Sequence, residues 1–189
     1  MKGLRGIAGL VAALLALSSG LTVARAAVGE RQVLALVRAL AYDRQLGERA
    51  GDDVRVGVAY APEHAAAARA VLDVLDGLSG VTIQDRPLSS VGVPYAEAGA
   101  LTRALEDGVD VVLVMGDGRA AAEIVRAVHG AGAVTAGFEP SLLAVGVPLV
   151  VSDESGDLEV YVNLPASRAA GQSFSSKLLQ IATVVREAP

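Results

Sequence analysis

The sequence predicts an α/β protein: a single three-layer domain whose mostly parallel sheet carries helices on both faces. Short β-branched runs alternate with segments of about 10 to 15 residues in which apolar side chains recur at helical spacing. That alternation is typical of parallel strands joined by right-handed crossovers. Near the end of the chain it stops, and two strand-like runs joined by a polar turn predict a C-terminal antiparallel hairpin followed by a helix.

The first part of the chain predicts a helix and two strand–helix units. Apolar residues recur at helical spacing from Val33, and the pattern stops near Gly47. A β-branched strand over 54–60 leads to a helix that begins at Pro62 and ends by Gly77. Its expected apolar face holds Ala67, Ala70, Val71, Val74 and Leu75. The next unit comprises a strand over 81–84, a loop over 87–94 and a helix over 96–106.

The second part contains the most hydrophobic strand, 109–115, then a helix over 118–129 and a strand over 133–136. Strands over 148–152 and 158–164 flank a turn of acidic, serine and glycine residues, which favours a hairpin at the sheet edge. A last helix is expected from about Phe174, with one apolar stripe made of Phe174, Leu178, Ile181, Ala182 and Val185.

The first 26 residues have the three parts of a secretory signal peptide. Lys2 and Arg5 precede an apolar run over 6–21, and a small-residue pattern ending at Ala26 suits signal peptidase. The run is shorter than the about 20 residues that a membrane-spanning helix needs, which disfavours the alternative of an anchor. We therefore expect a periplasmic protein with a mature domain over 27–189.

The expected mature chain is acidic and lacks cysteine. Without the first 26 residues, 13 basic residues face 21 acidic ones, a net charge of −8. This balance, with no basic tract and 3% aromatic residues, argues against nucleic acid as a partner. The absence of cysteine excludes thiolate metal sites, thiol nucleophiles and disulfide switches.

The C-terminal stretch contains several residues in an order that is typical of a known protein family. Val162-Asn163-Leu164 precedes Gly171, Phe174-Ser175 and Leu178-Leu179. The stretch resembles the YfiR/HmsC family of periplasmic proteins, in which a strand ending in such a triplet leads through a small-residue turn into an amphipathic helix. The resemblance implies a regulator that is not an enzyme and that binds and restrains a membrane-bound diguanylate cyclase, linking it to cyclic-di-GMP and biofilm.

A sensor kinase, contacted through its periplasmic segment, or an outer-membrane protein would serve equally well as the membrane-bound partner. A homodimer is compatible with the same interpretation. Redox sensing, which the resemblance would allow where members carry cysteine pairs, does not apply to this chain. We interpret the motif as structural, because Asn163 can cap the helical turn that Pro165 begins. The motif residues are Asn163, Leu164, Gly171, Phe174, Leu178 and Leu179.

The ends of the expected strands carry polar side chains. Ligands of open parallel sheets gather beyond the carboxyl ends of the strands. The competing hypothesis is therefore a periplasmic small-molecule (solute) binding module, although solute-binding proteins normally close two lobes and this chain makes one. Its ligand cleft would hold Glu63, His64, Asp117, Arg119, Phe138 and Glu139.

Other chemical signals are weak. The Gly-x-Gly-x-x-Ala pattern over 116–121, with Glu139 some 20 residues later, fits a dinucleotide fingerprint, but Asp117 is explained as a helix N-cap. His64 and His129 lack metal-ligand spacing, and the acidic turn over 153–159 lacks a calcium-loop pattern. We expect no cofactor, no metal and no catalytic residues.

Overall fold

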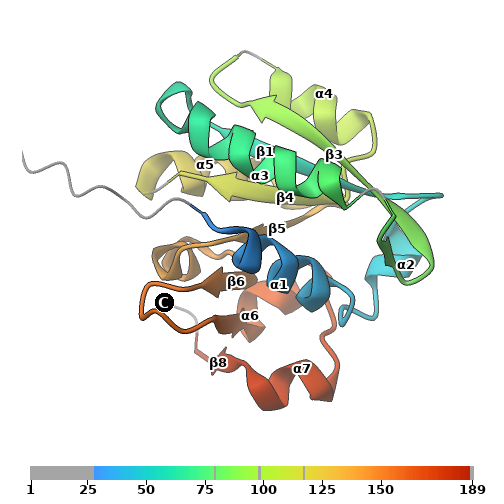
Figure 1. Ribbon diagram of the computed structural model, residues 1–189, viewed down its shortest axis with the longest axis vertical. Coiled ribbons are helices and arrows are strands. Elements are labelled where there is room, and N and C mark those ends of the chain that lie inside the picture. Colours follow the sequence, from blue (N-terminus) through green and yellow to red (C-terminus); the bar gives the residue numbers. More distant parts are fainter. Residues whose placement is uncertain (1–27, 79, 98, 117, 188–189) are drawn as a thin grey trace, which may run out of the picture.

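The computed structural model describes residues 28–78, 80–97, 99–116 and 118–187, so the expected signal peptide lies outside the described residues. In this part of the chain one sheet of eight strands has the order β2-β3-β1-β4-β5-β6-β7-β8 (Figure 1). The strands are β1 (Val54–Tyr60), β2 (Thr82–Ile83), β3 (Arg86–Pro94), β4 (Val111–Met115), β5 (Val134–Gly137), β6 (Leu149–Ser152), β7 (Glu159–Asn163) and β8 (Thr183–Val185).

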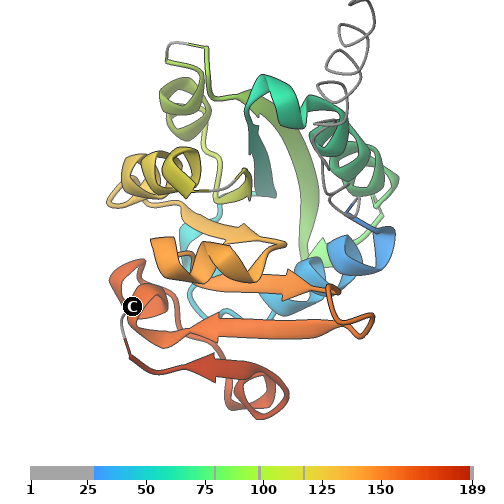
Figure 2. The ribbon, with the colours of Figure 1, turned by 90° about the vertical axis from the view of Figure 1, so that its left-hand side faces the viewer.

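Helices cover both faces of the sheet. They are α1 (Glu30–Leu40), α2 (Leu46–Arg49), α3 (Ala65–Gly77), α4 (Ala100–Glu106), α5 (Gly118–Val128), α6 (Leu164–Ala169) and α7 (Ser176–Ile181), with the 3₁₀ turns η1 (Pro62–His64) and η2 (Pro140–Val145). Figure 2 shows α1 and α3 on one side of the sheet and α4 and α5 on the other. The predicted three-layer α/β class is confirmed.

The middle strands are hydrophobic along their whole length because both faces are buried. In β4, Val111 and Leu113 belong to the core under α1 and α3, whereas Val112 and Val114 belong to the core under α4 and α5. Strands β3, β1, β4, β5 and β6 pair in parallel. This arrangement places their carboxyl ends along one edge of the sheet, which we call the carboxyl edge.

The expected loop over 87–94 is wrong, because these residues lie in β3 and pair in parallel with β1. Proline, serine and glycine in this segment had indicated a loop. The short side chains instead fit between packed elements: Ser90 Oγ donates to an Asp76 carboxylate oxygen at 2.6 Å, and a Cβ at Gly92 would meet Leu72 Cδ1 at 3.2 Å. Pairing with β1 outweighs the weak strand propensity of these residues.

The C-terminal region differs from its prediction in two ways. Strands β6 and β7 form the expected antiparallel pair, but β8 lies beside β7, so the pair is not at the sheet edge. The last helix ends at Ile181, which is 73% exposed, and Val185 lies in β8, so the predicted five-residue apolar stripe is wrong.

Two helix predictions near the start also need correction. The opening helix α1 ends at Leu40, and the short α2 follows it before Gly51. On α3 the buried residues are Ala68, Val71 and Leu75, whereas Ala70 is exposed.

Candidate functional site

The carboxyl edge contains a cavity of about 390 Å³, which we call the carboxyl-edge cavity. Four of the six residues predicted for a ligand cleft line it: Glu63, His64, Phe138 and Glu139. The other lining residues are Val28, Ala66, Ala67, Ala70, Val114, Met115 and Gly116.

The strand register explains why these residues meet. Tyr60, at the end of β1, pairs with Met115, at the end of β4, and Val114 pairs with Gly137 at the end of β5. Each strand therefore delivers its next residues to the same place. After β1 these are η1 with Glu63 and His64, after β4 Gly116, and after β5 Phe138 and Glu139.

Of the remaining two predicted residues, Arg119 is not among the described residues that line the cavity. The Arg119 side chain is 93% exposed, and its Nε donates to a Glu123 carboxylate oxygen at 3.2 Å along the same helix. Helical periodicity accounts for this position, because Ala121, Ile124 and Val128 form the buried face of α5. Asp117, with its expected role as an N-cap, lies outside the described residues.

The cavity has an apolar wall and an acidic rim. Small alanines of α3 and the buried Phe138 form much of the wall. Val28, two residues before α1, also lines the cavity. Gly116 lines the cavity, and a Cβ at this position would lie 3.8 Å from His64 Cδ2, an ordinary contact distance. Among the described lining residues, the acidic side chains are those of Glu63 and Glu139, and His64 contributes an imidazole.

Sequence reasoning missed Val28 and the alanines as cavity residues. Ala67 and Ala70 were expected in the core, and the i, i+3 spacing that indicated an apolar helix face is also what aligns them along the cavity. Nothing in the sequence around Val28 signals this position, because it depends on how α1 packs against the sheet.

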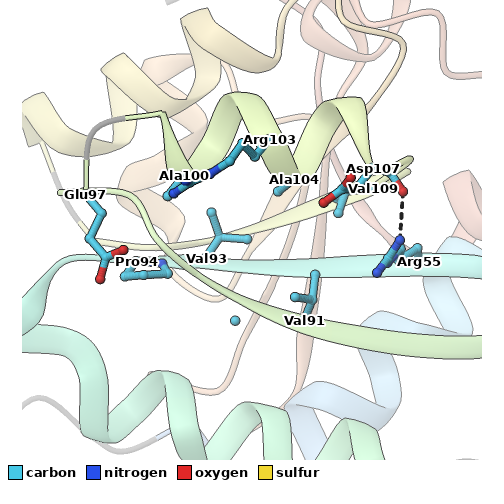
Figure 3. A pocket seen from close by; sticks show the side chains of 11 residues that line it. Arg55, Val91, Val93, Pro94, Glu97, Ala100, Arg103, Ala104, Asp107 and Val109 are labelled. Atoms are coloured by element: carbon cyan, nitrogen blue, oxygen red, sulfur yellow. Dashed lines mark hydrogen bonds between the residues drawn. The ribbon is translucent and has the colours of Figure 1, made fainter.

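A second, smaller groove of about 230 Å³ lies between β3 and α4 (Figure 3). Val91 and Val93 of β3 face it, and Arg55 Nη1 donates to the Asp107 carbonyl oxygen at 2.7 Å at one end. None of the predicted site residues that the structure describes lines this groove. We interpret it as a gap under a short helix, since α4 begins only after Gly99, whose φ of +75° lies in the left-handed region.

The hairpin and the histidines show no metal-binding arrangement. Within the described ranges, no group of three or more His, Cys, Asp and Glu side chains is placed to hold a metal ion. On β7 the Tyr161 hydroxyl donates to a Glu159 carboxylate oxygen at 2.7 Å, and this hydrogen bond raises the pKa of Tyr161. No helix in the described part of the chain combines the length and hydropathy needed to cross a membrane.

The C-terminal motif forms a capped turn. The Ala166 N–H donates to Asn163 Oδ1 at 3.1 Å, and the Asn163 amide donates to the Leu143 carbonyl oxygen at 3.2 Å. The buried Asn163 therefore caps α6 and ties it to η2. The other motif residues lie around it: Leu164 in α6, Gly171 in a turn with φ of +69°, Phe174 and Leu178 in the core, and Leu179 packed against that core.

A buried carboxylate joins this motif to the N-terminal helices. Asp43 is fully buried, pairs with Arg49, and accepts a hydrogen bond from the Ser173 N–H at 3.0 Å. Arg49 Nη1 in turn donates to the Gly171 carbonyl oxygen at 2.9 Å. We call these four residues the Asp43 clasp, because they hold the α6–α7 turn against the α1–α2 turn.

A family model described as YfiR/HmsC-like matches residues 48–183, which include strands β1 to β7 and the C-terminal motif. The chain belongs to the YfiR/HmsC-like family. Members of this family are periplasmic regulatory proteins, and the family is not known for an enzymatic activity. No curated protein matches the sequence.

Two solved structures have a similar fold. One is a conserved domain protein from Vibrio cholerae, with a TM-score of 0.58, 15% identity and 83% of this chain covered. The other is described as the ABC domain in complex with L-Trp from Streptococcus pneumonia, with a TM-score of 0.60, 11% identity and 82% of this chain covered. The chain spans about 60% of the length of each. At these identities the likeness shows the fold of this YfiR/HmsC-like chain.

Proposed function

We propose that this YfiR/HmsC-like protein is exported to the periplasm, where it binds and restrains a membrane-bound signalling protein such as a diguanylate cyclase. Membership of a family of periplasmic regulators, over residues 48–183, is the observation that carries the proposal. Regulation by binding requires a surface that can be buried against a partner. The helices on both faces of the sheet present the outer surfaces at which such a contact would form.

The test is a deletion of the gene, complemented with the wild-type chain. If the partner is a diguanylate cyclase, the deletion raises cellular cyclic-di-GMP and biofilm formation, and complementation restores both. Unchanged nucleotide levels would contradict a cyclase partner. Affinity capture from the detergent-solubilised envelope then identifies the partner, and recovery of a sensor kinase in place of a cyclase would redirect the proposal to that class.

A second candidate function is small-molecule binding at the carboxyl-edge cavity. The observation that favours it is the cavity itself, an apolar pocket of about 390 Å³ at the place where parallel sheets bind ligands. The similar Streptococcus structure is described in complex with L-Trp, so this fold is compatible with holding a small molecule. A bound metabolite would raise the melting temperature of the protein, and Glu139→Ala would reduce that rise.

A further inference from the structure

We infer that the part of the molecule formed by α6, α7 and β8 docks an extended acidic segment of the membrane-bound partner, which pairs with the outer edge of β8. We call this part the basic end; it comprises residues 164–187. The inference rests on the proposed regulatory function and specifies the contact surface and the chemistry of the segment that binds there. Three properties of the described residues support it: the distribution of charge, the outer edge of the sheet and an exposed apolar side chain.

Charge is divided unevenly along the expected mature chain. Residues 164–187 contain three basic residues and one acid, a net charge of +2, whereas residues 27–163 contain 10 basic and 20 acidic residues, a net charge of −10. The basic residues are Arg168 on α6, Lys177 on α7 and Arg186 after β8, and all three are exposed. None of them forms an ion pair with another described residue. An acidic segment is therefore attracted to this end and repelled by the rest of the protein.

The neighbouring strand does not reverse this sign. Strand β7 contains one acid, Glu159, whose carboxylate accepts a hydrogen bond from the Tyr161 hydroxyl at 2.7 Å. Counting residues 159–187 together, three basic residues face two acids, and the net charge is still positive at +1.

Strand β8 provides the backbone groups for pairing. It pairs in parallel with β7 and is last in the order of the sheet, so no other described strand lies beyond it. Both views show α7 and β8 at one end of the molecule (Figure 1 and Figure 2). An edge strand leaves N–H and C=O groups with which an extended peptide can pair. Because β8 has only three residues, this pairing needs additional contacts to give a stable complex.

An exposed apolar side chain supplies one such contact. Ile181 is 73% exposed, against 37% for Tyr42 and 39% for Val81, the other exposed large hydrophobic residues in the described ranges. It lies one helical turn after Lys177 on α7, so the two side chains share a face of that helix. Ile181 also lies two residues before Thr183, the first residue of β8, so a segment that extends along β8 is within reach of it.

The charges favour a protein segment over a bilayer or a second copy of this chain. Attachment to an anionic bilayer takes clusters of about 4 to 8 basic residues, whereas the basic end has three on a mature chain of net charge −8. Pairing of two β8 edges would bring two basic ends together, and like charges at such a contact are unfavourable. An acidic extended segment satisfies both the charge and the open edge.

The experiment measures the binding of short fluorescent peptides by anisotropy at pH 7, with protein purified after expression of the full chain. The acidic probe alternates valine with glutamate, and two matched probes replace glutamate with glutamine or with lysine. The acidic probe is expected to bind about tenfold more tightly than the glutamine probe, because two or three surface ion pairs together supply about that factor. The lysine probe should bind more weakly than both.

A fourth probe tests pairing with β8 separately from charge. It has the sequence of the acidic probe with every backbone nitrogen methylated, which removes the hydrogen-bond donors and keeps all the charges. It should bind about tenfold more weakly than the acidic probe. Equal binding of these two probes would overturn pairing with β8 and leave only charge attraction.

Variants of the protein test the location. Lys177→Glu/Arg186→Glu reverses two charges of the basic end and should weaken binding of the acidic probe about tenfold or more. Arg103→Glu/Arg126→Glu is the matched control, because it gives the same net charge by reversing two exposed cations on α4 and α5, and it should weaken binding less than about twofold. Ile181→Ser should weaken binding severalfold. Circular dichroism melts verify that each variant is folded.

Other occupants of the basic end give different results. Equal binding of the glutamate and lysine probes, or equal losses in the two charge-reversed variants, would overturn the inference. Sedimentation with phosphatidylglycerol vesicles, without binding of the acidic probe, would overturn it in favour of a bilayer. A dimer in sedimentation velocity that Ile181→Ser disrupts, again without binding of the probe, would overturn it in favour of a second copy.

The regulatory proposal is separated from the docking inference by complementation. Where the gene deletion raises cyclic-di-GMP, the Lys177→Glu/Arg186→Glu chain should fail to restore the wild-type level, and the Arg103→Glu/Arg126→Glu chain should restore it. Full restoration by the first chain would overturn the docking inference and retain the regulatory proposal. A deletion without effect would contradict a cyclase partner, and the peptide measurements would still decide whether the basic end binds an acidic segment.

Discussion

The Asp43 clasp and the carboxyl-edge cavity both contain acidic side chains, but they use them in different ways. Asp43 has a cation beside one oxygen and backbone N–H donors on the other, and it is fully buried. Glu63 is exposed at the rim of a cavity. A buried carboxylate whose partners come from its own chain stabilises the fold, whereas the exposed Glu63 carboxylate stays in contact with solvent at the mouth of a cavity.

The largest expected effect is at the clasp. Asp43→Ala removes the charge that compensates the largely buried Arg49 and leaves the Ser173 N–H without its acceptor. We expect a loss of about 3 kcal/mol or more in the free energy of unfolding, measured by urea denaturation. Asp52→Ala, an exposed acid nearby, is the control and should change stability by no more than about 0.5 kcal/mol. Equal effects of the two variants would contradict the clasp.

Gly137 and Gly116, at the ends of neighbouring strands, allow a tightly packed position to be compared with one beside the cavity. Gly137→Ala would place a Cβ 2.3 Å from Leu142 Cδ1, and Leu142 is buried, so overpacking should cost about 1–3 kcal/mol. At Gly116 the nearest atom, in His64, is 3.8 Å away, which is ordinary contact. Gly116→Ala should therefore retain a melting temperature within a few degrees of wild type. Similar losses from both variants would show that the cavity wall is as tightly packed as the core.

The α6 cap is expected to contribute less than the clasp. Asn163→Ala removes the acceptor for the Ala166 N–H and the donor to the Leu143 carbonyl oxygen. Loss of such a cap costs about 1–2 kcal/mol, which chemical denaturation can measure. Asn163→Asp retains the acceptor but places a buried carboxylate against the Leu143 carbonyl oxygen, so it should not recover the stability that the alanine variant loses at pH 7. An unchanged free energy of unfolding in Asn163→Ala would contradict the capping role.

Sequence patterns located the strands and the cap because these depend on local chemistry. The runs at β1, β4 and β5 are β-branched and lie between packed helices, and Asn163 is a good capping residue immediately before a proline. The strand β3 was not predicted, since pairing with β1 stabilises a segment of proline, serine and glycine that has little strand preference of its own.

The same distinction applies to the cavity. Residues that directly follow a strand, such as Glu63 and Phe138, could be placed at the carboxyl edge from the order of elements alone. Arg119 lies two residues inside the next helix, where the helical period directs it to solvent. Val28 reaches the cavity through the packing of α1 against the sheet, which no local pattern encodes.

Asp110 is an intermediate case between Asp43 and Glu63. It is buried like Asp43 but has fewer hydrogen-bonding partners. Its carboxylate accepts one hydrogen bond, from the Arg55 N–H at 2.8 Å, and burial raises its pKa above the ordinary value of 3.8. A raised pKa in the folded state means that the ionised form destabilises the fold, and this penalty is relieved as the pH falls through the raised pKa.

Asp110→Asn keeps an acceptor for the Arg55 N–H and removes the charge. The variant should therefore be slightly more stable than wild type at pH 7, and the gain should shrink as the pH falls and vanish below the ordinary pKa of 3.8. Thermal melts from pH 3 to 8 measure this difference. Asp43→Asn is the counterpart and should lose stability at pH 7, because there the charge is compensated by Arg49. If Asp110→Asn also lost stability at pH 7, the interactions of the ionised carboxylate would outweigh the cost of its burial at both positions. The number of hydrogen-bonding partners would then not explain the difference between Asp110 and Asp43.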